Sequence, residues 1–324
     1  MDPTLSAALQ YGGRVSAKPV LPARRSRLWR TAAALAVLLG LAGYLLVQYI
    51  TGGPGAPVCT VRAEGDEEAY ELSPEQAGNA ATISAVASAR GLPERAVTIA
   101  LATAMQESGL RNIDYGDRDS VGLFQQRPSQ DWGTVRQIMD PVYSAGEFYQ
   151  HLAKVPGYSR LPLTVAAQKV QRSGYPQAYA KHEANAARLT GALTGRDPGA
   201  MTCTESRPVD SEPGGAAAVR AKLVREFGPA VLPRTAGAGG RGAGGGQTLT
   251  VPVRQSGAGA DGDTARRGWQ LATWAMAHAA ELRIEQISYA GRMWSAADAE
   301  KGWQRRPGNG AASAERDVRI ITAK

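Results

Sequence analysis

The chain has 324 residues, 43% of them hydrophobic, together with 38 glycines and 19 prolines. This length and composition allow two folded domains joined by linkers. The formal net charge of +8 is uneven, because residues 1–30 carry +5, residues 59–203 carry −2 and residues 204–324 carry +5. No basic stripe interleaved with aromatic residues accompanies this charge, which argues against a nucleic-acid-binding protein.

Residues 1–50 combine a basic segment with an apolar one. Residues 1–30 are poor in hydrophobic residues, so we expect a disordered cytoplasmic tail with an arginine cluster at its end. Residues 31–50 contain no charged side chain, which predicts a transmembrane helix. Because the arginines precede it, the N-terminus should be cytoplasmic and the rest of the chain extracellular. A cleaved signal peptide is the alternative, disfavoured by the long basic region and by the lack of an Ala-x-Ala site.

Two cysteines, Cys59 and Cys203, enclose the next segment. In an extracellular protein an even and minimal cysteine count indicates one disulfide, which would join the two ends of a domain over residues 59–203. Unpaired thiols are the alternative. Neither cysteine lies in a Cys-x-x-Cys pair, so we expect no catalytic or metal-binding role for them.

Between the cysteines the sequence predicts helices. Their expected ranges are residues 73–91, 93–108, 141–152, 164–172 and 175–189. Pro74 and Pro93 suit first helical turns, and Gly109 suits a left-handed cap that ends the second helix. No strand pattern stands out over residues 59–200, so we expect this domain to be all-α.

Glu107 lies in the last turn of the second predicted helix. Partial burial and the negative end of the helix dipole would both raise the pKa of its carboxyl group. A carboxylic acid that stays protonated near neutral pH can donate a proton to a leaving oxygen. The alternative is an exposed glutamate without a role.

Three segments carry a family resemblance. Gln106-Glu107-Ser108, followed by Gly122-Leu123-Phe124-Gln125, resembles the signature of the lysozyme-like lytic transglycosylases, the soluble-transglycosylase superfamily. The segment 166–179 is similar to the third part of that signature, although Val170-Gln171 stands where the family has Tyr-Asn. The resemblance implies a lysozyme-like fold, with Glu107 as general acid/base and no cofactor. The sugar-binding residues expected beside it are Ser108, Gln125, Gln126 and Tyr179.

An acidic loop follows Glu107. Asp114, Asp117 and Asp119 are expected to shape this loop, with one of them paired to Arg118. A second catalytic carboxylate or a cation site are the alternatives. A transglycosylase needs no second carboxylate, because the substrate's own hydroxyl attacks after Glu107 has removed its proton.

Ring side chains near the motif have different expected roles. Trp132 lies on a loop beside the motif, and we expect it to stack on a sugar face. His151 and His182 have no matched partners in the sequence and are expected at the surface.

Residues 204–215 read as a linker and residues 216–324 as a C-terminal part. That part should begin with a helix over 216–227 and a glycine-rich linker over 237–246. A small α/β module should follow, with strands at 248–253, 284–290 and 317–322 and a helix at 264–282. The segments 268–274 and 289–294 resemble the C-terminal module of actinobacterial wall proteins, which is distantly related to zinc-dependent D,D-peptidase folds. Those peptidases need a His/Asp/His metal set, and His278 is the single histidine here, so we expect a binding or spacer module without metal.

The sequence therefore predicts a mainly α protein with an N-terminal transmembrane helix, an all-α lysozyme-like domain and a small C-terminal α/β module. The expected function is a membrane-anchored enzyme that cleaves peptidoglycan glycan strands outside the cell. The alternative is a non-catalytic wall-binding or scaffold protein that keeps a lysozyme-like groove. Membrane transport is disfavoured, because one predicted span and three scattered histidines offer no translocation path.

Overall fold

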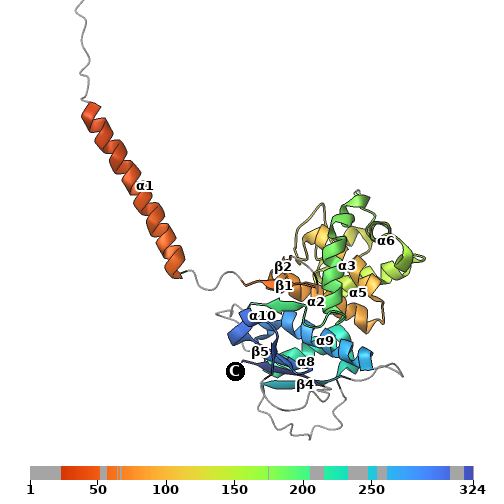
Figure 1. Cartoon of the computed structure of the whole chain (residues 1–324). Helices are drawn as coiled ribbons and strands as arrows, with labels where there is room; N and C mark the ends of the chain where they lie inside the picture. Colours follow the sequence, from red (N-terminus) through yellow and green to blue (C-terminus); the bar gives the residue numbers. More distant parts are fainter. Residues whose placement is uncertain are drawn as a thin grey trace, which may run out of the picture. The chain divides into compact units, whose positions relative to one another are not determined.

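The computed structural model describes residues 23–51, 57–63, 65, 68–173, 175–204, 215–232, 247–253, 261–306 and 317–323. The chain forms two compact units, Met1–Gly55 and Ala56–Lys324 (Figure 1). The predicted tail before Ala23, most of the predicted linker 204–215 and the predicted glycine-rich segment 237–246 lie outside the described residues.

The described part of the first unit is one helix, α1 (Ala23–Thr51). It begins ahead of the predicted span and takes in the arginine cluster. No helix in the described ranges combines the length and the apolar character needed to cross a membrane. The prediction of a transmembrane helix over residues 31–50 is corrected accordingly: the segment is helical, but it is not a membrane span by this requirement.

The second unit is mixed α/β, which corrects the prediction of a mainly α protein with an all-α domain. A small antiparallel sheet with strand order β2-β1-β3 joins the ends of the predicted domain. Its strands are β1 (Cys59–Val61), β2 (Tyr70–Leu72) and β3 (Met201–Cys203). Strands of three residues are too short to produce a recognisable alternating pattern, and their pairing is set by contacts far apart in the sequence.

Cys59 and Cys203 face each other across β1 and β3 and form the predicted disulfide. Both residues are buried. The bond closes a sequence separation of 144 residues, so it holds the start and the end of the first lobe, residues 57–204, together.

The first lobe is otherwise helical. Its helices are α2 (Pro74–Ala89), α3 (Glu94–Ser108), α4 (Val135–Ile138), α5 (Pro141–Ala153), α6 (Leu163–Gln171) and α7 (Glu183–Leu193), with 3-10 helices η1 (Pro128–Gln130), η2 (Tyr158–Arg160) and η3 (Pro176–His182). Ser73 and Gln76 form a capping box at the start of α2, and Gly109 ends α3 in the left-handed conformation as predicted. The helix predicted over 175–189 is divided into η3 and α7.

The second lobe, residues 215–323, contains the strands and the long helix predicted from its sequence. Its elements are α8 (Gly215–Phe227), η4 (Pro229–Val231), β4 (Thr248–Pro252), α9 (Asp261–Ala277), α10 (Ala279–Leu282), β5 (Ile284–Tyr289), β6 (Arg292–Ser295), η5 (Ala296–Lys301), β7 (Gln304–Arg305) and β8 (Asp317–Thr322). The sheet has strand order β4-β8-β5-β6-β7, and every pairing is antiparallel. Burial alternates along β4 and β8, as expected for a sheet with one face against helices.

Helix α2 lies between the two lobes (Figure 1). It contacts α3, α5 and α7 of the first lobe and α8 and α9 of the second. Every residue from Ala80 to Ala87 is buried, as expected for a helix without a polar face. Its small side chains let neighbouring helices approach closely. One continuous hydrophobic core therefore runs through both lobes.

A buried charge cluster joins the lobes beside α2. The imidazole of His278 is 2% exposed, with Nδ1 3.1 Å from Oε2 of Glu281 and Nε2 at an ion-pair distance of 3.6 Å from Oε2 of Glu226. Glu226 also accepts hydrogen bonds from Thr82 Oγ1 on α2 at 3.0 Å and from Trp274 Nε1 on α9 at 2.6 Å. Burial alone would lower the pKa of His278, but its two carboxylate partners outweigh burial and raise it.

Replacing both Cys59 and Cys203 by serine should lower the free energy of unfolding by about 4–5 kcal/mol, because the unfolded chain regains the entropy of a long open loop. Urea unfolding followed by circular dichroism measures this change. Wild-type protein unfolded in the presence of a reductant should lose a similar amount. A double variant as stable as the oxidised wild type would show that the disulfide does not stabilise the fold.

Replacing His278 by glutamine should lower the free energy of unfolding by about 3 kcal/mol, because the buried Glu226 would lose one of its two cationic partners and keep only Lys222, 3.4 Å away. The pKa of His278 is raised in the folded protein. The stabilisation that its charged imidazole provides is therefore complete below pH 6.5, the ordinary value, and is lost as the pH rises through the raised value. The pKa values of Glu226 and Glu281 are lowered in the folded protein, that of Glu281 to about 2. The stabilisation that their charged carboxylates provide is therefore complete above pH 4.5, their ordinary value, and is lost as the pH falls through the lowered values.

The difference between wild type and the His278→Gln variant should therefore be largest between pH 4.5 and 6.5 and should shrink at higher pH. Urea unfolding of both proteins across this range measures it. A difference that does not change with pH would contradict the charged state that we assign to His278.

Candidate functional site

Helix α3 places Glu107 at the boundary between core and solvent. Residues Ala96 to Met105 of this helix are all buried, whereas Glu107, one residue from the end, is half-buried. Gly109 then adopts a φ of 63°, which stops the helix directly after the motif. The carboxyl group of Glu107 therefore has the packed helix on one side and an accessible surface on the other.

Two residues from distant parts of the first lobe meet this carboxyl group. The hydroxyl of Tyr179, on η3, donates a hydrogen bond to Oε1 of Glu107 at 2.7 Å, and the tyrosine is fully buried. Gln171, at the end of α6, lies close enough to Glu107 to lower the pKa of its carboxyl group. Nε2 of Gln171 donates to the backbone oxygen of Phe124 at 2.7 Å, which ties α6 to the motif loop.

Burial raises the pKa of Glu107 above its ordinary value, and the hydrogen bond from Tyr179 and the nearby Gln171 side chain lower it by less. Among the described residues, no carboxylate takes part in this shift. Burial and the neighbouring charge of Glu107 raise the pKa of Tyr179, which keeps its hydroxyl a donor. In this arrangement burial favours the protonated form of the carboxyl group, and the hydrogen bond from Tyr179 stabilises its charged form.

The Gly-Leu-Phe-Gln motif is fixed against the end of α3. Ser108 Oγ donates a hydrogen bond to the backbone oxygen of Leu123 at 2.8 Å. Gly122 has a φ of +79°, and a Cβ there would lie 2.9 Å from the backbone oxygen of Ile138, so a larger residue does not fit. Gln125 has a φ of +47°, and its Nε2 donates to the backbone oxygen of Gly122 at 3.2 Å. Ser108 therefore positions the motif loop.

A cavity of about 460 Å³ opens beside these residues. Gln125, Gln126, Trp132 and Gln171 line it, so predicted site residues and the Glu107 partner share one wall. Gln126 is 1% exposed and its Nε2 donates to the backbone oxygen of Ser144 at 3.1 Å, which fixes this side chain to α5. Tyr179 and Glu107 are brought together as a pair, while Gln125, Gln126 and Trp132 are brought together around the cavity.

The two histidines of the first lobe have partners, contrary to the expectation from sequence. His151 lies edge-on to the half-buried ring of Trp132, with centroids 4.2 Å apart. Nε2 of His182 lies 3.2 Å from Oε1 of Gln106. The first contact joins a loop to α5 and the second joins α3 to η3, so neither could be read from local spacing.

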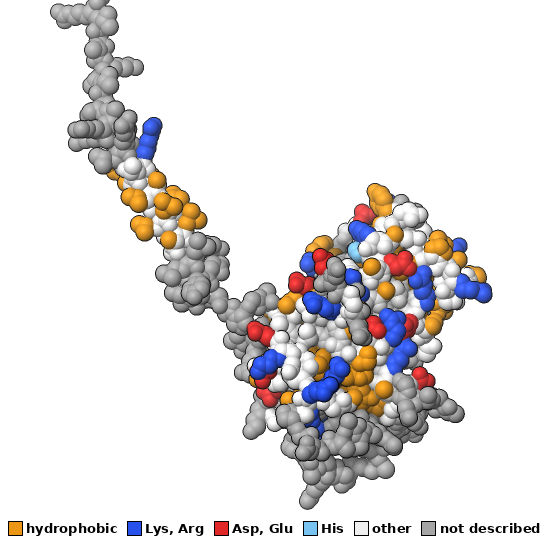
Figure 2. All heavy atoms as spheres, in the orientation of Figure 1, with side chains coloured by type: hydrophobic (Ala, Val, Ile, Leu, Met, Phe, Trp, Pro, Cys, Tyr) orange, Lys and Arg blue, Asp and Glu red, His pale blue; other side chains and the backbone are white. Residues whose placement is uncertain are grey.

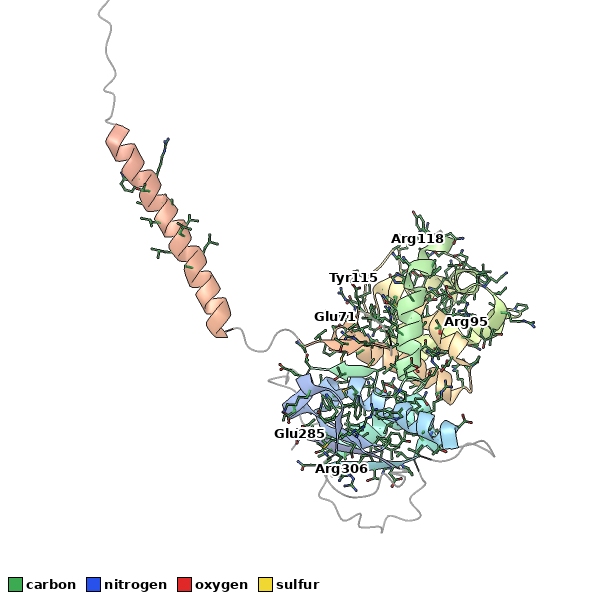
Figure 3. All side chains as sticks on the ribbon, in the orientation of Figure 1. Glu71, Arg95, Tyr115, Arg118, Glu285 and Arg306 are labelled. Atoms are coloured by element: carbon green, nitrogen blue, oxygen red, sulfur yellow. A yellow bond between two sulfur atoms is a disulfide. The ribbon has the colours of Figure 1, made fainter. Side chains whose placement is uncertain are left out.

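The acidic loop after α3 is held by its own ion pairs. Arg118 lies 4.0 Å from Asp117, and both side chains are exposed. Figure 3 shows Arg118 and Tyr115 at the edge of the second unit. Asp119 binds Nε of Arg127 at 2.8 Å, and this contact holds the pKa of Asp119 well below its usual range. Across the described ranges, no group of three or more His, Cys, Asp or Glu residues is arranged to hold a metal ion.

Gln171 is the site residue that sequence reasoning missed. The sequence showed it as a departure from the Tyr-Asn pair of the resembling family, and no spacing rule indicated contact with Glu107. Its amide contacts both the carboxyl group and the motif loop in the structure. The sequence offered one indication of this role, because Gln171 occupies the position of the asparagine in the family pattern.

Comparison with known proteins adds one match. Residues 213–316 match the family described as VldE, C-terminal domain. No curated protein shows a significant match to the chain. The matched range covers α8, α9 and most of the second sheet, and it leaves Glu107 and the cavity beside it outside the match.

Replacing Tyr179 by phenylalanine should raise the pKa of Glu107 further, because the carboxylate would lose a hydrogen-bond donor. A hydrogen bond to a charged group is worth about 1.5 kcal/mol, so the shift should be about one pH unit. Nuclear magnetic resonance titration of the Glu107 carboxyl carbon measures it. A Tyr175→Phe variant, which alters an exposed tyrosine nearby, is the control. An unchanged or lowered pKa in Tyr179→Phe would contradict this role.

Proposed function

We propose that this chain cleaves the glycan strands of peptidoglycan by a lytic-transglycosylase-like reaction, with Glu107 as general acid/base. The observation that carries the proposal is the half-buried carboxyl group of Glu107, with a raised pKa and a hydrogen bond from Tyr179. Gln171 links it to the cavity, because this side chain contacts Glu107 and lines the cavity wall.

In the proposed reaction, protonated Glu107 donates its proton to the oxygen of the glycosidic bond as the bond to the anomeric carbon breaks. The carboxylate that results, stabilised by Tyr179 and Gln171, then accepts a proton from a hydroxyl of the same sugar. That hydroxyl oxygen bonds to the anomeric carbon, which gives an anhydro-sugar end without water. Glu107 returns to its protonated form.

The intramolecular route fits the groups around Glu107. Hydrolysis by paired carboxylates requires a second acid within about 10 Å that acts on the sugar. The groups that shift the pKa of Glu107 are burial, Tyr179 and Gln171, with no carboxylate among them in the described part of the chain. Asp119 in the acidic loop is bound to Arg127 and Ser129.

Two other features support a role at the cell wall. Acidic and basic side chains are interspersed on the face of the second unit shown in Figure 2, which does not favour a polyanion such as nucleic acid as the partner of that face. The disulfide between Cys59 and Cys203 suits an oxidising, extracytoplasmic compartment. A non-catalytic wall-binding protein would use the same cavity, and the next experiment separates the two functions.

The Glu107→Gln variant of the full chain should lose wall-cleaving activity by a factor of about 10²–10⁴, because the amide cannot transfer the proton. Loss of turbidity of purified wall sacculi measures the activity, and mass spectrometry of the products should show anhydro ends. Glu71→Gln is the control, since Glu71 is exposed on β2 (Figure 3). Equal activity of wild type and Glu107→Gln would remove Glu107 from the mechanism, and an inactive wild type that binds sacculi would favour the binding protein.

A further inference from the structure

The cavity lined by Gln125, Gln126 and Gln171 has a basic wall, and Glu107 itself is not among its lining residues. Lys154, Lys169 and Arg172 line it together with Trp132. The three cations are exposed, and none of them forms an ion pair with a described residue. Arg127, a fourth basic residue of the wall, is already neutralised by Asp119. The cavity therefore carries a net positive charge with no internal counterion from the described residues.

Two of these cations, Lys154 and Arg172, lower the pKa of the same residue in the wall, His151. The pKa of His151 is lowered, first by burial and then by the charges of Lys154 and Arg172, while Glu147 acts in the opposite direction. Lys154 ends α5 and Arg172 ends α6, so two separate helices direct positive charge to one place. Cations at helix C-termini also compensate the helix dipole, but that role does not require them to meet around a shared cavity.

The remaining wall is suited to a sugar. The ring of Trp132 provides an apolar face on the cavity. Oε1 of Gln126, Nδ1 of His151 and Oε1 of Gln171 are buried and have no hydrogen-bond partner among the described residues. Buried polar atoms are nearly always paired in native proteins, so three unpaired atoms in the residues of one wall point to a polar ligand.

We propose that this cavity binds a carboxylate-bearing sugar of the glycan strand, next to the bond that Glu107 acts on. Lys154, Lys169 and Arg172 recognise the carboxylate, and Trp132 packs against the sugar ring. Gln171 sets the register, since it lies in the cavity wall and contacts Glu107. The identity of the strand rests on the proposed function, whereas the preference for a carboxylate rests on the charged wall.

Binding of two matched polymers by the full chain tests this proposal. The first is peptide-free peptidoglycan glycan strands, whose muramic acid sugars carry free carboxylates, and the second is the same strands with their carboxylates converted to amides. Titration calorimetry with the Glu107→Gln chain measures affinity without cleavage, and wild type is measured in parallel at early times. The carboxylated strands should bind about tenfold more tightly, since three exposed charge contacts of about 0.5 kcal/mol each sum to one factor of ten.

A variant with Lys154→Gln, Lys169→Gln and Arg172→Gln should bind the two polymers with affinities within about twofold of each other, because its cavity has lost the unpaired cations. The matched control removes the same number of charges at exposed positions of the second lobe, Arg220→Gln, Arg305→Gln and Arg319→Gln, and should keep the preference. Raising the salt concentration should reduce the preference of the unmodified cavity, because exposed charges are screened.

Equal affinity for the two polymers, a preference that survives in the cavity variant, or no binding of either polymer would overturn the proposal. Failure of the proposed function gives a different result. In that case wild type would prefer the carboxylated strands in the binding measurement and release no anhydro products from them. Cleavage of both polymers at equal rates with equal affinity would leave the proposed function standing and remove the carboxylate site.

Discussion

The enclosure of α2 is the constraint on which the rest of this structure depends. Its sequence from Ala80 to Ala87 has no face that can remain in water, so helices must cover it on all sides. Helices α3, α5 and α7 cover part of it, and α8 and α9 cover the remainder. The second lobe therefore completes the core of the first, and the hydrogen bond from Thr82 on α2 to the buried Glu226, which pairs with the buried His278, links the lobes at one position.

The candidate site follows from the same packing. Because α3 is buried up to Met105, its final turn emerges where the core ends, and Glu107 is left half-buried there. The covering segments then bring Tyr179 and Gln171 to the carboxyl group from residues far along the chain. Burial raises the pKa of the acid, and the two donors prepare it to lose its proton, which is the balance that a general acid/base requires.

The two lobes contribute different parts of the structure. Glu107 and the cavity with its cationic wall lie in the first lobe, where the disulfide and the small sheet close the domain ends. The second lobe, which contains the match to the VldE C-terminal domain family, contributes core contacts and buried charges at α2. Its helices α8 and α9 contact α2, the helix against which α3 also packs.

The sequence by itself determined the local features: the start of α2 at Pro74, the end of α3 at Gly109, the long helices, the strands β4, β5 and β8 of the second lobe and the pairing of two lone cysteines, whereas it missed β6 and β7. These depend on neighbouring residues or on simple counting. Only the tertiary structure decided what depends on distant contacts. It corrected the all-α and membrane-span predictions, paired strands of three residues, joined Tyr179 and Gln171 to Glu107, and gathered cations from two helix ends around one cavity. Such contacts leave no local pattern, because packing between segments far apart in the chain sets them.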